Sequence, residues 1–201
     1  VIAHLLGNLQ LFLEPSAINT YAKWLHDKGA LLWIARGGLL VVFLLHVATG
    51  IRLARQNRAA RPVAYQSEAT LKATFASRSM VFSGLTLLVF IVYHLMHFTF
   101  GIVHTDEFAK KAMRAGGFDV HTMVASSFAV PAIAITYAAA QIVLFLHLRH
   151  GIQSFAQTLG LRHARWTPFV ETLSVVLAAL IACGNALLAL SVMTGLVKVA
   201  A

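Results

Sequence analysis

Charged residues are scarce in this chain of 201 residues. Asp, Glu, Lys and Arg together make up 11% of it, and 59% of the residues are hydrophobic. Soluble domains usually carry about 25% charged residues. The few charges are also clustered, so that long apolar runs remain between them. This shortage excludes an ordinary soluble domain and indicates one polytopic membrane domain, residues 1–201, built as a helix bundle.

Cysteine and carboxylate side chains are the next shortage. The single cysteine, Cys183, lies within an apolar run. One cysteine excludes an intrachain disulfide framework and a cysteine-based metal site, so we expect a small buried core residue there. The acids Glu14 and Glu171 lie only at the ends of apolar runs. An acidic proton relay at membrane depth is therefore not expected.

The apolar runs predict an all-α fold of five transmembrane helices. The first run stops at Leu13, after 13 residues, although a span needs about 20. We therefore expect its N-terminal part to precede Val1. Pro131 is expected to kink the fourth helix without ending it. The predicted helices cover residues 1–13, Ala30–Leu53, Ser79–His104, His121–Ser154 and Thr167–Val197.

The net charge of +9 is explained by topology rather than by nucleic-acid binding. The connections after the second and fourth helices carry nine Lys/Arg and few acids. The remaining connections and the C-terminus carry six, with most of the acids. By the positive-inside rule, the first set faces the cytoplasm. The prediction is a multi-pass protein of the cell membrane with a cytoplasmic N-terminus and an external C-terminus.

Four apolar runs each carry a histidine far from the membrane surface, and these histidines pair in depth. His4 and His94 each lie nine residues before the outer end of their helix, which is about 14 Å. His46 lies 15 residues after Leu31, about 22 Å below the outer face. His147 reaches the same depth when counted from Ala132, provided that the fourth helix projects from the bilayer before Pro131.

Two stacked pairs of imidazoles within a four-helix core suit two b haems. Low-spin haem iron takes two axial imidazoles, and haem is an apolar disc that fills a bundle. The metal ligands would be His4 with His94 at an outer haem and His46 with His147 at an inner haem. Zinc would want three or four convergent ligands. The alternative is that all four are hydrogen-bonded core residues.

Two further histidines, His97 and His150, follow a predicted ligand by three residues. Each shares a helix face with that ligand but sits one turn nearer the surface. We expect a hydrogen bond to a haem propionate or a quinone, with an interfacial polar residue as the alternative. The other four histidines lie in connections or at helix ends and are expected to be solvated: His26, His104, His121 and His163.

Several stretches, spread over nearly the whole chain, resemble one known family. It is the cytochrome b558 membrane-anchor subunit of succinate dehydrogenase and fumarate reductase, in its single-chain, five-helix, dihaem type. In that family the first histidine of each stretch is a haem ligand, which implies the same four residues. The stretches are HLLGNLQLF (4–12), HVATGIRLARQNRAARPVAY (46–65), ASRSMVFSG (76–84), YHLMHF (93–98), HLRHGIQSFAQTLGL (147–161) and RW (165–166).

The resemblance implies a role within respiratory complex II. A flavoprotein subunit oxidises succinate, an iron–sulfur subunit relays electrons, and this chain passes them through two b haems to a quinone, with menaquinone expected. The dicarboxylate site lies on a partner. The basic connection Arg52–Arg78 would face the iron–sulfur subunit. No catalytic residue and no nucleic-acid partner is expected in this chain.

The sequence indicates the quinone site less clearly than the haem sites. Arg36 is a charge inside the second helix, at the depth of the outer propionates or a quinone, unless it snorkels to the surface. Ser79 is a weaker quinone candidate, and Arg78 and Arg149 could pair with inner propionates.

Two other classes of membrane protein stay open. One is a different quinone-linked or ferric-reducing haem b protein, which would carry two ligands on one helix. The other is a non-haem transporter.

Overall fold

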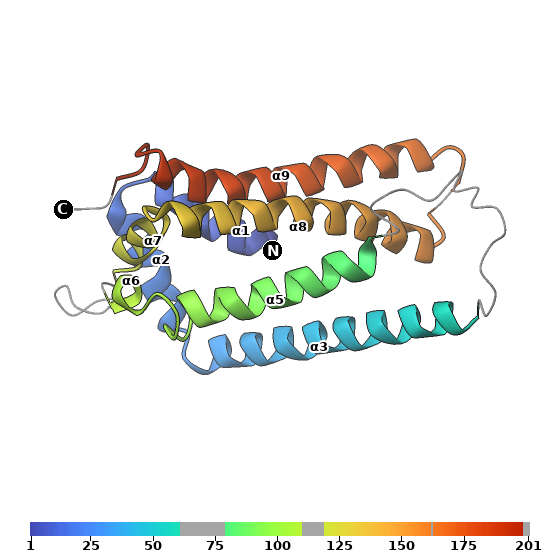
Figure 1. Cartoon of the computed structure of the whole chain (residues 1–201), viewed down its shortest axis with the longest axis horizontal. Coiled ribbons are helices and arrows are strands. Elements are labelled where there is room, and N and C mark those ends of the chain that lie inside the picture. Colours follow the sequence, from blue (N-terminus) through green and yellow to red (C-terminus); the bar gives the residue numbers. More distant parts are fainter. Residues whose placement is uncertain (61–78, 110–118, 162, 199–201) are drawn as a thin grey trace.

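The computed structural model describes residues 1–60, 79–109, 119–161 and 163–198, and within these ranges every regular element is a helix. The chain begins with α1 (Ile2–Asn8), the 3₁₀ helix η1 (Leu9–Phe12) and α2 (Pro15–His26). The long helices α3 (Ala30–Ala59), α5 (Met80–Phe98), α8 (Pro131–Thr158) and α9 (Thr167–Met193) run side by side in alternating directions (Figure 1). The short helices α6 (Thr105–Ala109) and α7 (Val120–Phe128) gather at one end with α2.

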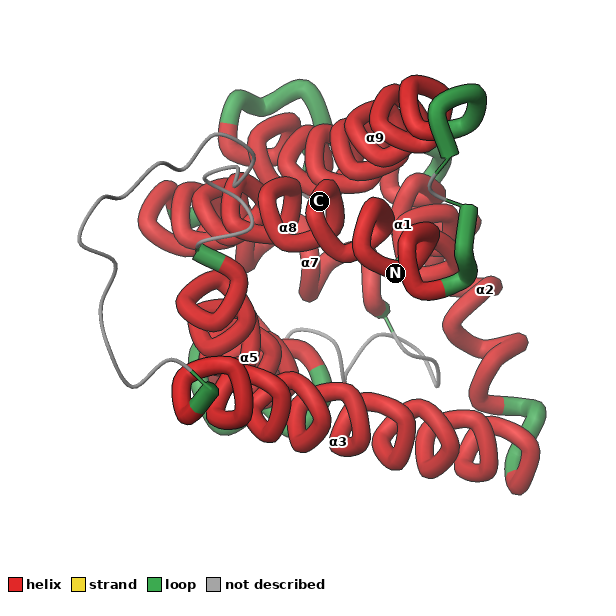
Figure 2. The backbone as a smooth tube through the Cα atoms, turned by 90° about the vertical axis from the view of Figure 1, so that its right-hand side faces the viewer, coloured by secondary structure: helices red, strands yellow, loops and turns green. Residues whose placement is uncertain are grey.

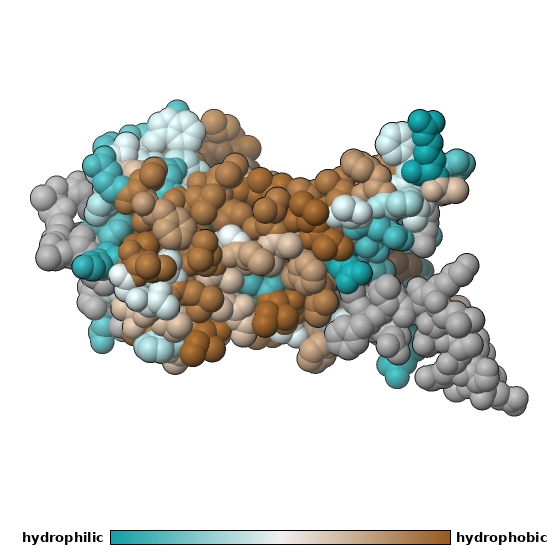
Figure 3. Space-filling model, turned by 90° about the horizontal axis from the view of Figure 1, so that it is seen from above, coloured by the Kyte–Doolittle hydropathy of each residue, from teal (hydrophilic) through white to brown (hydrophobic). Residues whose placement is uncertain are grey.

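Four helices are long and apolar enough to cross a membrane: α3, α5, α8 and α9. Apolar residues cover the middle of the face seen in Figure 3, and hydrophilic residues gather at its two ends. This is the surface of a multi-pass membrane protein. The first predicted span corresponds to a short apolar helix, Ile2–Phe12, so the predicted count of five stays a prediction.

The fourth predicted helix is interrupted, and the expectation of one kinked helix from His121 to Ser154 is wrong. Helix α7 ends at Phe128, and α8 starts at Pro131. Val130 between them is extended, with φ −83° and ψ 112°. Proline disfavours the helical conformation in the residue before it and favours the first position of a helix. Pro131 therefore starts a new helix instead of kinking an old one.

The third predicted helix is shorter than expected. Helix α5 ends at Phe98 rather than at His104, and the chain then turns through Gly101 at φ +65°. A Cβ atom added to Gly101 would overlap the ring of Phe108 from α6. Glycine thus provides both the left-handed conformation and the space that this turn needs.

Packing is uneven across the bundle. Helices α8 and α9 pack along much of their length, and the main hydrophobic core lies where they meet α1, α2 and α7. Helix α3 has no buried residue, although its centre is strongly apolar. Figure 2 shows it along one side of the molecule, next to α5. Most of the α3 surface is thus left for lipid or another apolar partner to cover.

The expected burial of Cys183 is wrong. It lies on α9 with its side chain exposed. Apolar sequence around a cysteine does not distinguish a core position from a lipid-facing one, because both are apolar in a membrane protein.

Candidate functional site: two histidine pairs

The four histidines that were paired by depth lie in two ring-to-ring contacts. His4 on α1 and His94 on α5 have ring centroids 5.8 Å apart, with an interplanar angle of 89°. His46 on α3 and His147 on α8 have centroids 6.2 Å apart, with an angle of 78°. Each pair joins helices that are far apart in sequence, and each helix provides one histidine.

These separations match two imidazoles that share one metal ion. A metal–imidazole bond is about 2.0–2.1 Å long, and the ring centre lies about 1.1 Å beyond the nitrogen, so trans ligands have centroids about 6.2–6.4 Å apart. Both pairs come within about half an ångström of that range. Among the described residues, no group of three or more His, Cys, Asp or Glu could hold a metal ion. The described residues therefore provide two imidazoles at each pair and no third ligand of these types.

The protein itself does not bury these imidazoles. His4 and His46 are exposed, and His94 and His147 are half-buried. Within the described part of the chain, the rings of His46 and His94 make no hydrogen bond. An imidazole facing hydrocarbon without a partner is costly. An additional group between the helices would remove that cost.

The Nδ1 side of the His147 ring is hydrogen-bonded to Ser83 on α5. The Ser83 hydroxyl donates to the carbonyl oxygen of Met80 at 3.0 Å, so its oxygen accepts the Nδ1–H of His147 at 3.1 Å. The lone pair is then on Nε2, as in metal-bound histidines whose other nitrogen donates to the protein. A Cβ atom on Gly84 would lie 3.4 Å from Cε1 of His147, so glycine allows the ring to lie close to α5.

The surroundings of the His4–His94 pair are different. The Asn8 amide nitrogen lies 3.0 Å from His4 Nε2, one helical turn away, and donates to it. Binding a metal through Nε2 therefore requires the Asn8 side chain to move. His94 is surrounded by the rings of Phe90, Phe98 and Tyr137, at centroid distances of 5.6–6.2 Å. The ring separation of this pair fits two axial ligands, but Nε2 of His4 is occupied by the hydrogen bond from Asn8.

His97 lies in the opposite environment, completely buried at 0% exposure. Its Nδ1 accepts from the Tyr137 hydroxyl at 3.0 Å, and its Nε2–H donates to Ser127 Oγ at 3.1 Å. The roles follow because Ser127 donates its own proton to the Met123 carbonyl oxygen at 2.8 Å. His97 thus links α5 to α7 and α8. A hydrogen bond from His97 to a propionate or quinone would require one of these bonds to open.

The other predicted site residues are dispersed. Arg36 is exposed on α3, and its guanidinium lies over the Trp33 ring, 4.9 Å from the centroid. Ser79 precedes α5, while Arg149 and His150 are half-buried on α8. Arg78 lies outside the described residues. The structure brings the four predicted ligands into two pairs. No hydrogen bond or ring contact joins Arg36, Arg149 or His150 to either pair among the described residues.

Two histidines expected to be solvated have partners or are buried. Nε2 of His104 forms a hydrogen bond with the Tyr93 hydroxyl at 2.9 Å. His121 is 2% exposed, and its backbone N–H donates to Asn19 Oδ1 at 3.0 Å. Burial lowers the pKa of His121, although the nearby Asp119 carboxylate acts in the opposite direction. The signal for this region was Asp119 before Thr122, an N-cap that starts α7 and fixes His121 in its first turn.

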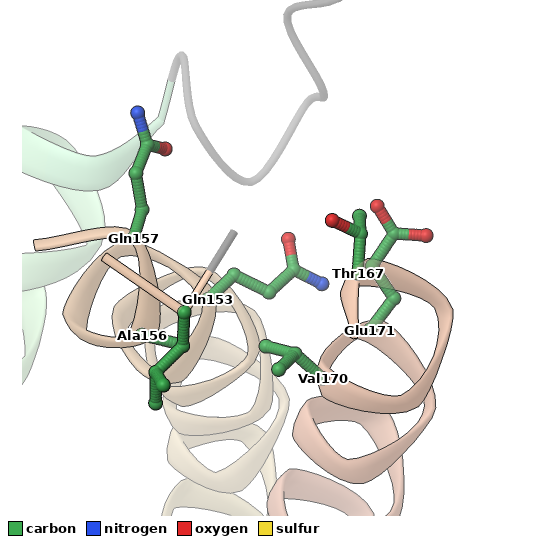
Figure 4. Close-up of a pocket in the computed structure, with 7 residues that line it drawn as sticks. Gln153, Ala156, Gln157, Thr167, Val170 and Glu171 are labelled. Atoms are coloured by element: carbon green, nitrogen blue, oxygen red, sulfur yellow. The ribbon is translucent and has the colours of Figure 1, made fainter. Parts of the chain in front are cut away.

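A small cavity of about 30 Å³ lies between α8 and α9, near the start of α9. Gln153, Thr167 and Glu171 line it with polar groups (Figure 4). Gln153 donates to Ser174 Oγ at 2.8 Å beneath it. The volume suits one or two water molecules and is far too small for a quinone ring.

Known proteins were compared with this chain in three ways. No family model matches it, and neither a curated protein nor a solved structure does.

Proposed function

We propose that this chain is the dihaem cytochrome b membrane anchor of a succinate:quinone oxidoreductase, in the manner of the family that its sequence resembles. The observation that carries the proposal is the pairing of four histidines from four helices at the separation of two axial imidazoles. His4 and His94 would hold one haem, and His46 and His147 the other. The five-helix count is part of the same proposal, with the N-terminal apolar helix as the first span.

Three features support haem rather than a set of core histidines. The paired rings are exposed or half-buried, whereas His97 is fully buried and has both ring nitrogens hydrogen-bonded. Ser83 fixes His147 with Nε2 free. The apolar helix α3 carries His46 but buries no side chain of its own. A haem between the helices would bind the free imidazole nitrogens through its iron and would cover the apolar surface of α3 with its ring.

The pattern also disfavours a cytochrome whose helices each carry two ligands. Such a protein needs two histidines several turns apart on one helix. Here the same-helix neighbours are only three residues apart, and His97 is engaged with Tyr137 and Ser127.

In this role the bound haems would supply one-electron carriers, and the chain would supply their ligands, their apolar surroundings and the anchorage of its partners. The partners would be an iron–sulfur subunit and a flavoprotein subunit, with the dicarboxylate chemistry on the flavoprotein. Menaquinone would be the electron acceptor. The connections after α3 and α8 would face the cytoplasm, as their positive charge predicts, and the C-terminus would lie outside.

A reduced-minus-oxidised spectrum of membranes containing the chain tests the proposal. We expect an α-band near about 560 nm, as b haems give, on reduction with dithionite. With the two partner subunits present, succinate should reduce part of the same band. Membranes without any such band would contradict the haem assignment, and a band that succinate never reduces would contradict the complex II assignment.

A further inference from the structure

Two cation–indole pairs lie at the turn between α2 and α3, at the end of the bundle where α6 and α7 gather (Figure 1). The Lys28 ammonium lies over the Trp24 ring, 4.4 Å from its centroid. The Arg36 guanidinium lies over the Trp33 ring, 4.9 Å from its centroid. Both separations are within the range of cation–π contacts. Each pair thus presents a positive charge beside an indole that is more than half exposed.

Positive charge exceeds negative charge at this turn. Residues 23–36 contain three Lys/Arg and one acid. Lys23 and Asp27 neutralise each other in a salt bridge of 2.8 Å. Lys28 and Arg36 are exposed, and neither forms an ion pair within the part of the chain that the structure describes. The two cations over the indoles are therefore the ones that an anionic group would complement.

The Arg36 side chain is directed toward the end of the bundle. Trp33, which its guanidinium covers, lies one helical turn nearer the start of α3. Long cationic side chains in membrane proteins extend along apolar surface until the charge reaches the headgroup level, and indole rings concentrate at that same level. Lys28 lies just before α3 begins at Ala30. Both cations are therefore at the depth of lipid headgroups rather than of acyl chains.

An exposed apolar face of α3 continues from Trp33 toward the middle of the bundle. Leu40 and Leu44 follow on this face and are exposed. A Cβ atom added to Gly37, one turn after Trp33, would have nothing within 4 Å, so the glycine leaves a shallow gap there. At 3.6 residues per turn, these positions lie roughly opposite His46 on the helix. A haem bound at His46 would not cover this face.

We propose that this corner of α2 and α3 binds an anionic phospholipid. Its phosphate would lie at Lys28 and Arg36, and an acyl chain would run along the face that begins at Trp33 and Gly37. A zwitterionic lipid offers the same apolar contacts, but its own ammonium group would be repelled by the two cations. Lipid binding here does not depend on haem, and it assigns Arg36 to a headgroup rather than to a propionate or a quinone.

A second transmembrane helix suits this face less well than an acyl chain. Closely packed membrane helices place small residues four positions apart, so that the two backbones approach each other over a full turn. Gly37 instead has Trp33 one turn before it and Val41 one turn after it. A single gap between large side chains fits a narrow, flexible chain.

The test is native mass spectrometry of the purified full chain in detergent, with phosphatidylglycerol and phosphatidylcholine of identical acyl chains added in competition. We expect the wild-type chain to retain phosphatidylglycerol preferentially. Lys28→Gln and Arg36→Gln should each lower that preference about fivefold, the value of one cation near a headgroup. Trp33→Leu should lower it less, because the cation stays but loses its support. Lys198→Gln removes an exposed cation at the same end of the bundle and is the matched control.

Each variant is also measured for haem content and for elution as a single species, so that a general loss of structure is recognised. Equal retention of the two lipids by the wild-type chain would overturn the proposal, and so would an equal loss of preference in Lys198→Gln. Loss of haem in Arg36→Gln with an unchanged lipid preference would also overturn it, because Arg36 would then serve a propionate. A wild-type chain that prefers phosphatidylglycerol but contains no haem would leave the lipid site standing and remove the proposed function.

Discussion

His97 and the paired histidines, on two sides of this bundle, differ in how far their rings are buried and in how many ring nitrogens are hydrogen-bonded. On the packed side, formed by α7, α8 and α9 with the end of α5, His97 is fully buried and bonded through both ring nitrogens. On the open side, where α3 and α1 face α5 and α8, the paired rings are exposed or half-buried. Among the described residues of that side, His147 and His4 each have a hydrogen-bond partner for one ring nitrogen.

The contrast is the one expected if the paired histidines are ligands and His97 has a structural role. A structural imidazole in an apolar interior has to satisfy both nitrogens within the protein, because no water is present to do so. A ligand needs one nitrogen held and the other free, which is the arrangement of His147. The two sides therefore make different predictions for the same kind of substitution.

The largest effect is expected from His46→Leu on the open side. It removes one proposed axial ligand of the pair with His147, so the protein should retain one haem of two while still inserting into membranes. Haem content per chain and the membrane fraction of the protein measure this outcome. His97→Leu is the matched control and should keep both haems. Equal loss from both substitutions would contradict the division between the two sides.

Ser83→Ala should have the next largest effect. It removes the acceptor that orients His147, and such supporting residues commonly change metal affinity by about 10–100-fold. Haem retention during dilution into haem-free detergent, together with the midpoint potential of the affected haem, would measure it. Ser174→Ala, at a buried serine on α9 that bonds Gln153, provides a comparison and should leave both haem readouts unchanged.

His97→Leu should weaken the packed side without touching the haem ligands. The Tyr137 hydroxyl would lose its acceptor in the interior, which costs about 1–3 kcal/mol. Thermal or denaturant unfolding in detergent would record the loss. If Tyr137→Phe is combined with it, the two effects should be less than additive, since both remove the same bond. Full additivity would argue against a shared hydrogen bond.

The smallest effect is expected at the start of α7. Asp119→Ala removes the N-cap and the bond from Asn19, and loss of a cap costs about 1 kcal/mol. Asp119→Asn should be close to neutral, because asparagine caps helices about as well as aspartate. Unfolding measured side by side for the two variants separates the cap from the charge. Equal losses in Asp119→Asn and Asp119→Ala would show that the charge, and not the cap hydrogen bond, is what matters.

The sequence predicted the long helices well where local signals were strong. The starts of α3 at Ala30 and of α9 at Thr167 agree with the structure, since Thr167-Pro168 is a clear helix start. The break before Pro131 was missed because the apolar run continues across it. Val130 is extended because it precedes Pro131, and proline disfavours the helical conformation in the residue before it. This local rule predicts a helix boundary at Pro131.

Depth counting predicted which histidines could meet, because helix rise alone fixes depth. It could not predict how deeply His97 or His121 is buried, or that Cys183 is exposed, since burial depends on which helix packs against which face. Asp119 and Asn19, which hold His121 in position, are 100 residues apart in sequence. No local pattern reports such a contact.

In the proposed function, each histidine pair holds one haem. The direct measurement is the ratio of haem to protein in the purified wild-type chain, combined with the low-spin bis-imidazole signature in its electron paramagnetic resonance spectrum. We expect two haems per chain, both low-spin with two nitrogen ligands. A haem-free protein, a single haem, or high-spin iron with one histidine ligand would contradict it.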